Sequence, residues 1–213
     1  MTGKMDDFAS FSIVPIGANT VYPLGDLYVD TNYWMDIALK RRLWRVPEQY
    51  LIRYVGLTNN YILWSPHTDD EVIQCFHVDE YIREAKLRGI ASEGNKPPYK
   101  ILEDQIEMAG RMVLTKRTLD GFDTIRKMFN DTVYPIDQID VTPTTLKIMD
   151  IYGVPPKDAK HLAYMWHEET NNLFTRDTNF TTVPGLNLYS GNILTNGNPP
   201  FPISAFMPEL TPL

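Results

Sequence analysis

The stretch Leu27-Tyr28-Val29-Asp30-Thr31-Asn32 indicates both the fold and the position of a site. A short apolar run ends in an acid, and a helical spacing of apolar residues begins directly after it. The same change from strand to helix recurs after Tyr61 to Ser65. Strands that alternate with helices predict a central parallel sheet covered by helices on both faces. The sequence therefore predicts an α/β domain.

The alternation extends over residues 26–189, which are expected to form one domain. Residues 1–25 are expected to be an N-terminal extension, and residues 190–213 a Pro-rich tail that is extended or packs on a neighbour. Apolar residues at helical spacing in 92–136 predict a helical arm or insert beside the site. The strands are expected at about 26–30, 61–65, 138–141, 173–175 and 186–189.

The composition is typical of a packed globular protein. The chain has 213 residues, of which 43% are hydrophobic, so it can bury an ordinary core. The net charge of -7 gives no support to binding through an overall positive field. The single cysteine, Cys75, excludes an intrachain disulfide and fits a reducing compartment. No apolar run approaches the ~20 residues that cross a bilayer, and the first residues lack a signal-peptide pattern. We expect a cytoplasmic protein with no membrane partner.

Four acids, Asp30, Glu71, Asp158 and Asp177, stand where a short strand meets a helix or loop. Residues just past the carboxyl ends of parallel strands converge, although they are far apart in sequence. Carboxylates that meet in this way repel one another unless cations neutralise them. Mg²⁺ and Mn²⁺ prefer such oxygen ligands, and a pair of these ions can promote hydrolysis of a phosphodiester. The sequence therefore predicts one shared metal site.

Each of these acids also has an ordinary structural role open to it. Glu71 follows Thr68 at the spacing of a capping box. Asp158 falls in a first helical turn, where the helix dipole favours negative charge. Asp30 and Asp177 stand where an acid can cap a helix or stabilise a turn. The matching positions of all four acids favour a common site over four separate roles.

Four motifs occur in order along the chain: Val29-Asp30-Thr31-Asn32, Ser65 with Glu71, Asp158-Ala159-Lys160-His161-Leu162-Ala163 and Thr175-Arg176-Asp177-Thr178-Asn179-Phe180. Together they resemble the PIN-domain ribonucleases, the family that includes the VapC toxins. The resemblance implies a three-layer α/β/α fold with a short central parallel sheet. It also implies endoribonuclease activity that depends on Mg²⁺ or Mn²⁺.

The resemblance assigns roles to particular residues. Asp30, Glu71, Asp158 and Asp177 match the catalytic, metal-binding acids of the family, while Asn32 and Thr175 match polar residues that orient them. RNA is the implied substrate, and an antitoxin protein and a second copy of the chain are candidate partners. On the expected arm, the basic residues that we consider for contact with RNA phosphates are Arg111, Lys116 and Arg117.

A second local resemblance competes with the first. The string Pro66-His67-Thr68-Asp69-Asp70-Glu71 is similar to the Pro-His-x-Asp-Asp-Glu motif of zinc-dependent N-acetylglucosaminyl deacetylases related to LmbE. That similarity implies that His67 and Asp70 bind Zn²⁺ and that Asp69 is a general base. The glycines that follow the motif in that family are missing here. In addition, His161 and His167 fall on opposite sides of one predicted helix.

A third interpretation is a non-catalytic PIN-like module that binds RNA or a protein. The presence of all four acids favours the nuclease over this module.

Overall fold

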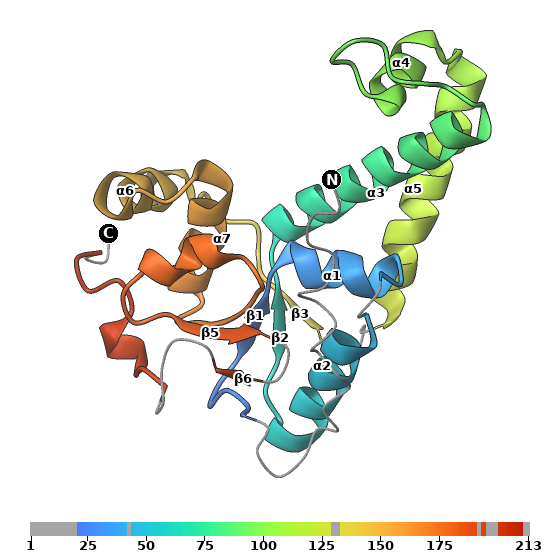
Figure 1. The fold of residues 1–213 in the computed structure, drawn as a ribbon. Coiled ribbons are helices and arrows are strands. Elements are labelled where there is room, and N and C mark those ends of the chain that lie inside the picture. The colour runs from blue at the N-terminus through green and yellow to red at the C-terminus, as the bar shows by residue number, and fades with distance from the viewer. Residues whose placement is uncertain (1–20, 42–43, 129–132, 191–192, 195–199, 211–213) are drawn as a thin grey trace, which may run out of the picture.

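The structure, a computed structural model, describes residues 21–41, 44–128, 133–190, 193–194 and 200–210 (Figure 1). Residues 1–20 of the expected N-terminal extension therefore lie outside the described part. The strands are β1 (Leu27–Val29), β2 (Ile62–Trp64), β3 (Val133–Pro135), β4 (Asn172–Phe174), β5 (Asn187–Ser190) and β6 (Ile193–Leu194). The helices are α1 (Thr31–Ala38), α2 (Arg45–Thr58), α3 (Pro66–Leu87), α4 (Pro98–Gln105), α5 (Met108–Met128), α6 (Thr142–Tyr152) and α7 (Pro156–His167), with short 3₁₀ helices η1 (Thr178–Thr182) and η2 (Ile203–Ala205).

The strands form one sheet in the order β3-β2-β1-β4-β5-β6. Strands β1 to β5 run parallel, and β6 pairs antiparallel with β5. Strand β1 lies between β2 and β4, so that Tyr28 faces Leu63 on one side and Leu173 on the other. The predicted α/β class is therefore confirmed.

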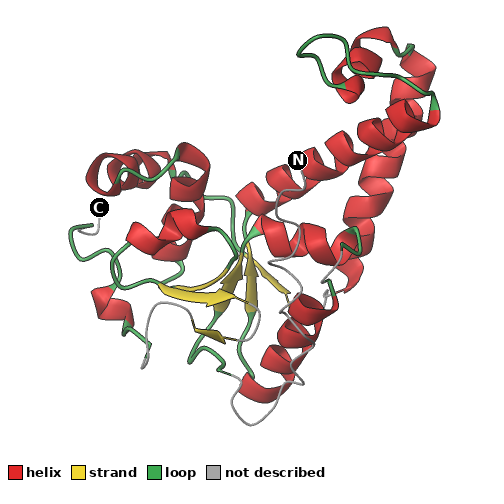
Figure 2. Ribbon diagram, viewed as in Figure 1, coloured by secondary structure: helices red, strands yellow, loops and turns green. Residues whose placement is uncertain are grey.

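Helices cover both faces of this sheet, as a short parallel sheet requires (Figure 2). Alternate residues of β1 point to opposite faces: Leu27 and Val29 pack in one core, and Tyr28 packs in the other. The first core includes α1, α2 and the near ends of α3 and α5, and the second includes α6 and α7. The result is the three-layer α/β/α arrangement.

A helical arm extends away from the sheet (Figure 1). It is built from the far half of α3, α4 and α5, so it begins earlier in the chain than the predicted 92–136. It has a small core of its own, formed by Tyr81, Ala85, Leu102, Ile106 and Leu114. Within the described part of the chain, none of the helices combines the length and apolar character that crossing a membrane demands.

The third strand is not where the sequence predicted it. It comprises Val133–Pro135 instead of 138–141, and it forms the edge of the sheet next to β2. Pro135 lacks an N–H group, which an edge strand tolerates, and Tyr134 is half exposed, so the segment shows no apolar alternation. Buried Val141, which had suggested a strand, packs from the loop before α6.

The described part of the tail packs on the domain itself. Phe206, Met207 and Leu210 are buried in the same core as α6 and α7. The side chains of Asn171 and Asn187 donate to the carbonyl of Phe201 at 3.0 Å each. Gly185, at φ +69°, allows this approach, because a Cβ there would lie 1.9 Å from the carbonyl oxygen of Ala205. Residues 200–210 are therefore part of the folded unit.

We predict that Phe206→Ala lowers the free energy of unfolding by about 3–5 kcal/mol, because it leaves a cavity in the core. Phe206 is 2% exposed, whereas Phe201 is 40% exposed, so Phe201→Ala is the matched control and should cost less than about 1 kcal/mol. Urea unfolding of both variants checks this. Equal, small effects would show that the tail does not contribute to the core.

Candidate metal centre at the carboxyl ends of the strands

The candidate site lies where β1, β2 and β4 end side by side. Asp30 follows β1 and precedes α1, and Ser65 follows β2 and caps α3. Thr175 follows β4, and Asp177 caps η1. The chain passes from β1 to β2 on one side and returns to β4 on the other, so the strand order reverses at β1. A reversal of this kind creates the crevice in which open α/β sheets bind ligands.

Asp30 is buried and held by two side chains. Its Oδ2 accepts hydrogen bonds from Thr175 Oγ1 at 2.6 Å and from Asn32 Nδ2 at 3.0 Å. The Thr175 hydroxyl oxygen also accepts from the backbone N–H of Asp177 at 2.9 Å. Thr175 therefore links the two acids, and both Thr175 and Asn32 donate hydrogen bonds to Asp30.

Asp158 and Asp177 meet at Asn179. The Nδ2 group of Asn179 lies 3.2 Å from Asp158 Oδ2 and 3.5 Å from Asp177 Oδ2. Burial raises the pKa of Asp158, the hydrogen bond from Asn179 lowers it, and the charges of Asp177 and Asp30 raise it again. Asp158, Asp177 and Asp30 are thus close enough for their charges to repel.

An ion pair fixes the loop that carries Asp177. The guanidinium of Arg176 donates to both carboxylate oxygens of Asp36 in α1, at 2.6 and 3.1 Å. Asp36 is buried, and a two-point contact sets the orientation of both partners. The loop after β4 is therefore fastened to the helix that follows Asp30.

Glu71 does not close a capping box. The N-cap of α3 is Ser65, whose Oγ accepts from the backbone N–H of Thr68 at 3.1 Å, so Glu71 falls in the second turn. Its Oε2 accepts from Thr31 Oγ1 at 2.8 Å, which places the carboxylate beside the residue that follows Asp30. Lys157 Nζ lies 3.4 Å from Oε1.

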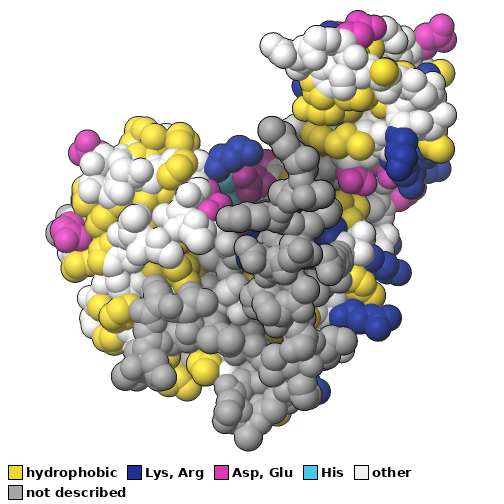
Figure 3. Space-filling view, in the orientation of Figure 1, with side chains coloured by type: hydrophobic (Ala, Val, Ile, Leu, Met, Phe, Trp, Pro, Cys, Tyr) yellow, Lys and Arg dark blue, Asp and Glu magenta, His cyan; other side chains and the backbone are white. Residues whose placement is uncertain are grey.

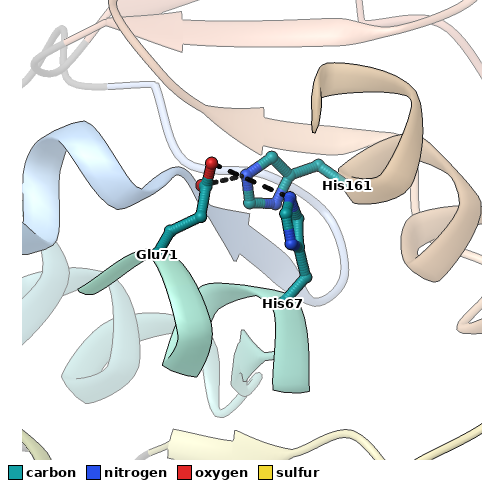
Figure 4. A group of neighbouring side chains, drawn as sticks. All are labelled: His67, Glu71 and His161. Atoms are coloured by element: carbon teal, nitrogen blue, oxygen red, sulfur yellow. Dashed lines mark hydrogen bonds and ion pairs between the residues drawn. The ribbon is translucent and has the colours of Figure 1, made fainter. Parts of the chain in front are cut away.

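Two histidines that the nuclease prediction did not include contact Glu71 (Figure 4). His161 Nε2 lies 2.9 Å from Glu71 Oε2, and His67 Nε2 lies 3.8 Å from Oε1. Both imidazoles are buried, and their ring centroids are 4.5 Å apart. His67 and Glu71 are four residues apart on α3, a spacing that places them on one face and could have indicated the pair. The contact with His161 in α7 depends on the tertiary fold.

A chain of hydroxyl groups lies behind His161. Its Nδ1 is 2.8 Å from Tyr28 Oη, which is 2.5 Å from Ser65 Oγ and 3.2 Å from Thr68 Oγ1. Burial raises the pKa of Tyr28, so this hydroxyl stays protonated. Hydroxyl groups both donate and accept, so the chain supports either neutral tautomer of His161.

His161 lowers the pKa of both Glu71 and His67. Burial alone would raise the pKa of Glu71, but the hydrogen bond and charge of His161, together with Thr31, lower it to about 2. Burial and the charge of His161 lower the pKa of His67 to about 4. At neutral pH, Glu71 is therefore an anion and His67 a neutral imidazole.

The side chains at the strand ends thus fall into two neighbouring sets, and Glu71 lies in a different set from the three predicted aspartates. Of the described residues, His67, Glu71 and His161 form a group whose ligand atoms all lie within 4.8 Å of one another. The second set, Asp30, Asp158 and Asp177, is linked through Thr175 and Asn179, and the hydroxyl of Thr31, next to Asp30, donates to Glu71 of the first set. Acidic, basic and histidine side chains gather between the base of the arm and α7 (Figure 3).

The two aspartates that the deacetylase motif assigns to zinc chemistry do not lie with His67. Asp69 accepts a hydrogen bond from the indole Nε1 of Trp64 at 2.5 Å, and Asp70 is exposed. The acid that accompanies His67 is Glu71. His167 lies 3.3 Å from Thr144 Oγ1 in α6, on another side of α7 from His161, as the sequence predicted.

The three basic residues of the predicted arm lie on α5. Arg111 donates to the carbonyls of Ile106 and Glu103, and Arg117 lies 3.4 Å from Glu84. Lys116 is exposed. Two of the three side chains therefore already make contacts within the arm.

Comparisons of the chain with known protein families, curated proteins and solved structures find no match.

We predict that Glu71 makes stability depend on pH below its ordinary pKa of 4.5. Because the folded-state pKa is lowered to about 2, unfolding takes up a proton in this window. The stabilisation is fully present above about pH 4.5 and is lost as the pH falls towards 2.

The measurement is urea unfolding with a chelator between pH 4.5 and 2.5. Glu71→Gln should remove up to about 1.4 kcal/mol per pH unit from the slope of stability against pH, the value for one proton. Exposed Glu107 supplies the control, Glu107→Gln. If Glu71→Gln shows the same slope of stability against pH as the wild type, the lowered pKa does not belong to Glu71.

Proposed function

We propose that the protein is a metal-dependent endoribonuclease in which Asp30, Glu71, Asp158 and Asp177 bind Mg²⁺ or Mn²⁺. The observation that carries this proposal is that Asp30, Asp158 and Asp177 come from three separate segments and are linked through Thr175 and Asn179. Burial raises the pKa of Asp158, and the charges of Asp177 and Asp30 add to this effect. If each acid served only to cap its own helix or turn, the acids would have no reason to lie close together. A divalent cation would relieve the repulsion between these charges.

The donor set fits a hard cation. In the described part of the chain, both side-chain hydrogen bonds to Asp30 fall on Oδ2, which leaves Oδ1 as a candidate ligand atom. Asp158 and Asp177 also offer carboxylate oxygens, and the amide of Asn179 supports both. Oxygen ligands of this type are those that Mg²⁺ and Mn²⁺ prefer.

The surroundings suit hydrolysis of a phosphodiester. Asp30, Asp158 and Asp177 would hold a divalent cation, which would supply activation of water and stabilisation of the leaving oxygen. The residues of the chain hold the acids in place: Thr175 and Asn32 orient Asp30, and the Arg176–Asp36 pair fixes the loop of Asp177. Cleavage is proposed to leave 5′-phosphate and 3′-hydroxyl ends, as the resemblance to PIN-domain ribonucleases implies.

We predict that Asp30→Asn reduces Mn²⁺-dependent cleavage of single-stranded RNA to background while the fold stays intact. The amide keeps the shape of the side chain but removes the negative charge that binds the cation. Asp150→Asn, an exposed position on α6, is the control and should cleave at the wild-type rate. Circular dichroism checks the fold of both variants. Wild-type cleavage by Asp30→Asn would refute the proposed site.

The arm is proposed to contact the RNA backbone through Arg111, Lys116 and Arg117. We predict that Lys116→Ala weakens RNA binding and reduces the slope of log K against log salt by about 0.7, the value for one contact with a single strand. Exposed Lys127, which pairs with Asp123 at the end of α5, supplies the control Lys127→Ala. An affinity that is insensitive to salt in the wild-type protein would remove the arm from the binding surface.

A further inference from the structure

We propose that His67, Glu71 and His161 form a second metal site, specific for a divalent transition cation of the Zn²⁺ type. This inference goes beyond the nuclease proposal and does not depend on it, because the two sites share only Glu71. The ligands also differ from those of the deacetylase motif, which would pair His67 with Asp70.

The donor set suits zinc better than magnesium. Two imidazole nitrogens and one carboxylate form the ligand set of open zinc sites, which keep one further position for water. Imidazole favours zinc and other transition cations, whereas Mg²⁺ favours oxygen ligands. The three side chains converge from two helices, α3 and α7 (Figure 4).

The spacing of the ligand atoms fits one ion. With bonds of about 2.0–2.1 Å, two ligands of a tetrahedral zinc lie about 3.3 Å apart. The separation from Glu71 Oε2 to His161 Nε2 is 2.9 Å, and that from Glu71 Oε1 to His67 Nε2 is 3.8 Å. These distances involve the two different oxygens of the carboxylate. One ligand atom from each of the three residues lies within 4.8 Å of the other two, so rotations of the side chains would close the set around one ion.

The position of His67 Nε2 is an independent sign of a ligand. This nitrogen is buried and has no hydrogen-bond partner within the described residues. The side chain is 8% exposed, and its Nε2 points towards Glu71 and His161. Buried polar atoms without a partner are uncommon in native proteins, and an ion is one explanation for such an atom. A hydrogen bond between Glu71 and His161 alone would not account for it.

The groups around His161 are arranged to support a bound metal. A ligating imidazole usually donates its second N–H to an oxygen, which fixes the ring. If Nε2 binds the ion, Nδ1–H donates to Tyr28 Oη, and Tyr28 in turn donates to Ser65 or Thr68. Lys157, 3.4 Å from Glu71 Oε1, is largely exposed and can move away when the cation arrives.

Calorimetric titration with Zn²⁺ in excess Mg²⁺ tests the site. We expect one zinc per wild-type chain and a loss of affinity in His67→Gln of more than the 10–100-fold that removal of an outer partner costs. His167→Gln is the matched control, since His167 contacts Thr144 instead, and it should bind as the wild type does. Equal zinc affinity in His67→Gln and the wild type would overturn the proposal.

A second measurement avoids any change at the site. The chain has four histidines, so the variant His77→Gln/His167→Gln retains only His67 and His161. Long-range ¹H–¹⁵N NMR should show that one equivalent of Zn²⁺ shifts a ring nitrogen of both remaining imidazoles. Imidazole signals that do not move would overturn the proposal.

The variant Asp177→Asn separates a test of the acid cluster from a test of the zinc site. This variant should lose RNA cleavage if the nuclease proposal holds, yet it should still bind one zinc with wild-type affinity. Loss of zinc binding in Asp177→Asn would place the zinc on the acids and refute the second site. If the wild-type protein does not cleave RNA, or if Asp177→Asn cleaves at the wild-type rate, while zinc still binds at His67 and His161, the nuclease proposal alone is overturned.

Discussion

The parallel pairing of β1 between β2 and β4 is the constraint on which the rest of the structure depends. It aligns three strand ends, and most of the candidate site follows one of them: Asp30 after β1, α3 after β2 and Thr175 after β4. Asp158 and His161 lie on α7, which precedes β4. The hydrogen bond from Thr175 to Asp30 joins residues that are distant in sequence, and it exists only with this register. On the opposite side of β1, Tyr28 bridges to Ser65 and His161 in the same way.

Periodicity and the positions of acids were enough to predict the α/β class and the convergence of segments at the strand ends. They failed where a segment lacks a local pattern. Edge strand β3 contains Pro135 and half-exposed Tyr134, so it has no alternating apolar pattern. The tail is held by burial of Phe206 in a distant part of the core, and its proline-rich sequence gives no local sign of this contact. The contact of Glu71 with His161 was also missed, because no spacing within the chain links α3 to α7.

Glu71 belongs to both candidate sites, and its surroundings bear on how they interact. Thr31 connects it to the acid side, and His161 connects it to the imidazole side through the same oxygen, Oε2. Hard cations favour the oxygen-rich set and zinc favours the imidazoles, so the two sets select different ions with one shared carboxylate. Under both proposals, the two sites would draw on the same carboxylate of Glu71.

The measurement that most directly tests the central claim is an anomalous difference map from a crystal soaked in Mn²⁺, since it requires no knowledge of the substrate. The account predicts a peak within bonding distance of carboxylate oxygens from at least two of Asp30, Asp158 and Asp177. A crystal with Mn²⁺ bound elsewhere, or with no peak among these acids, would contradict it.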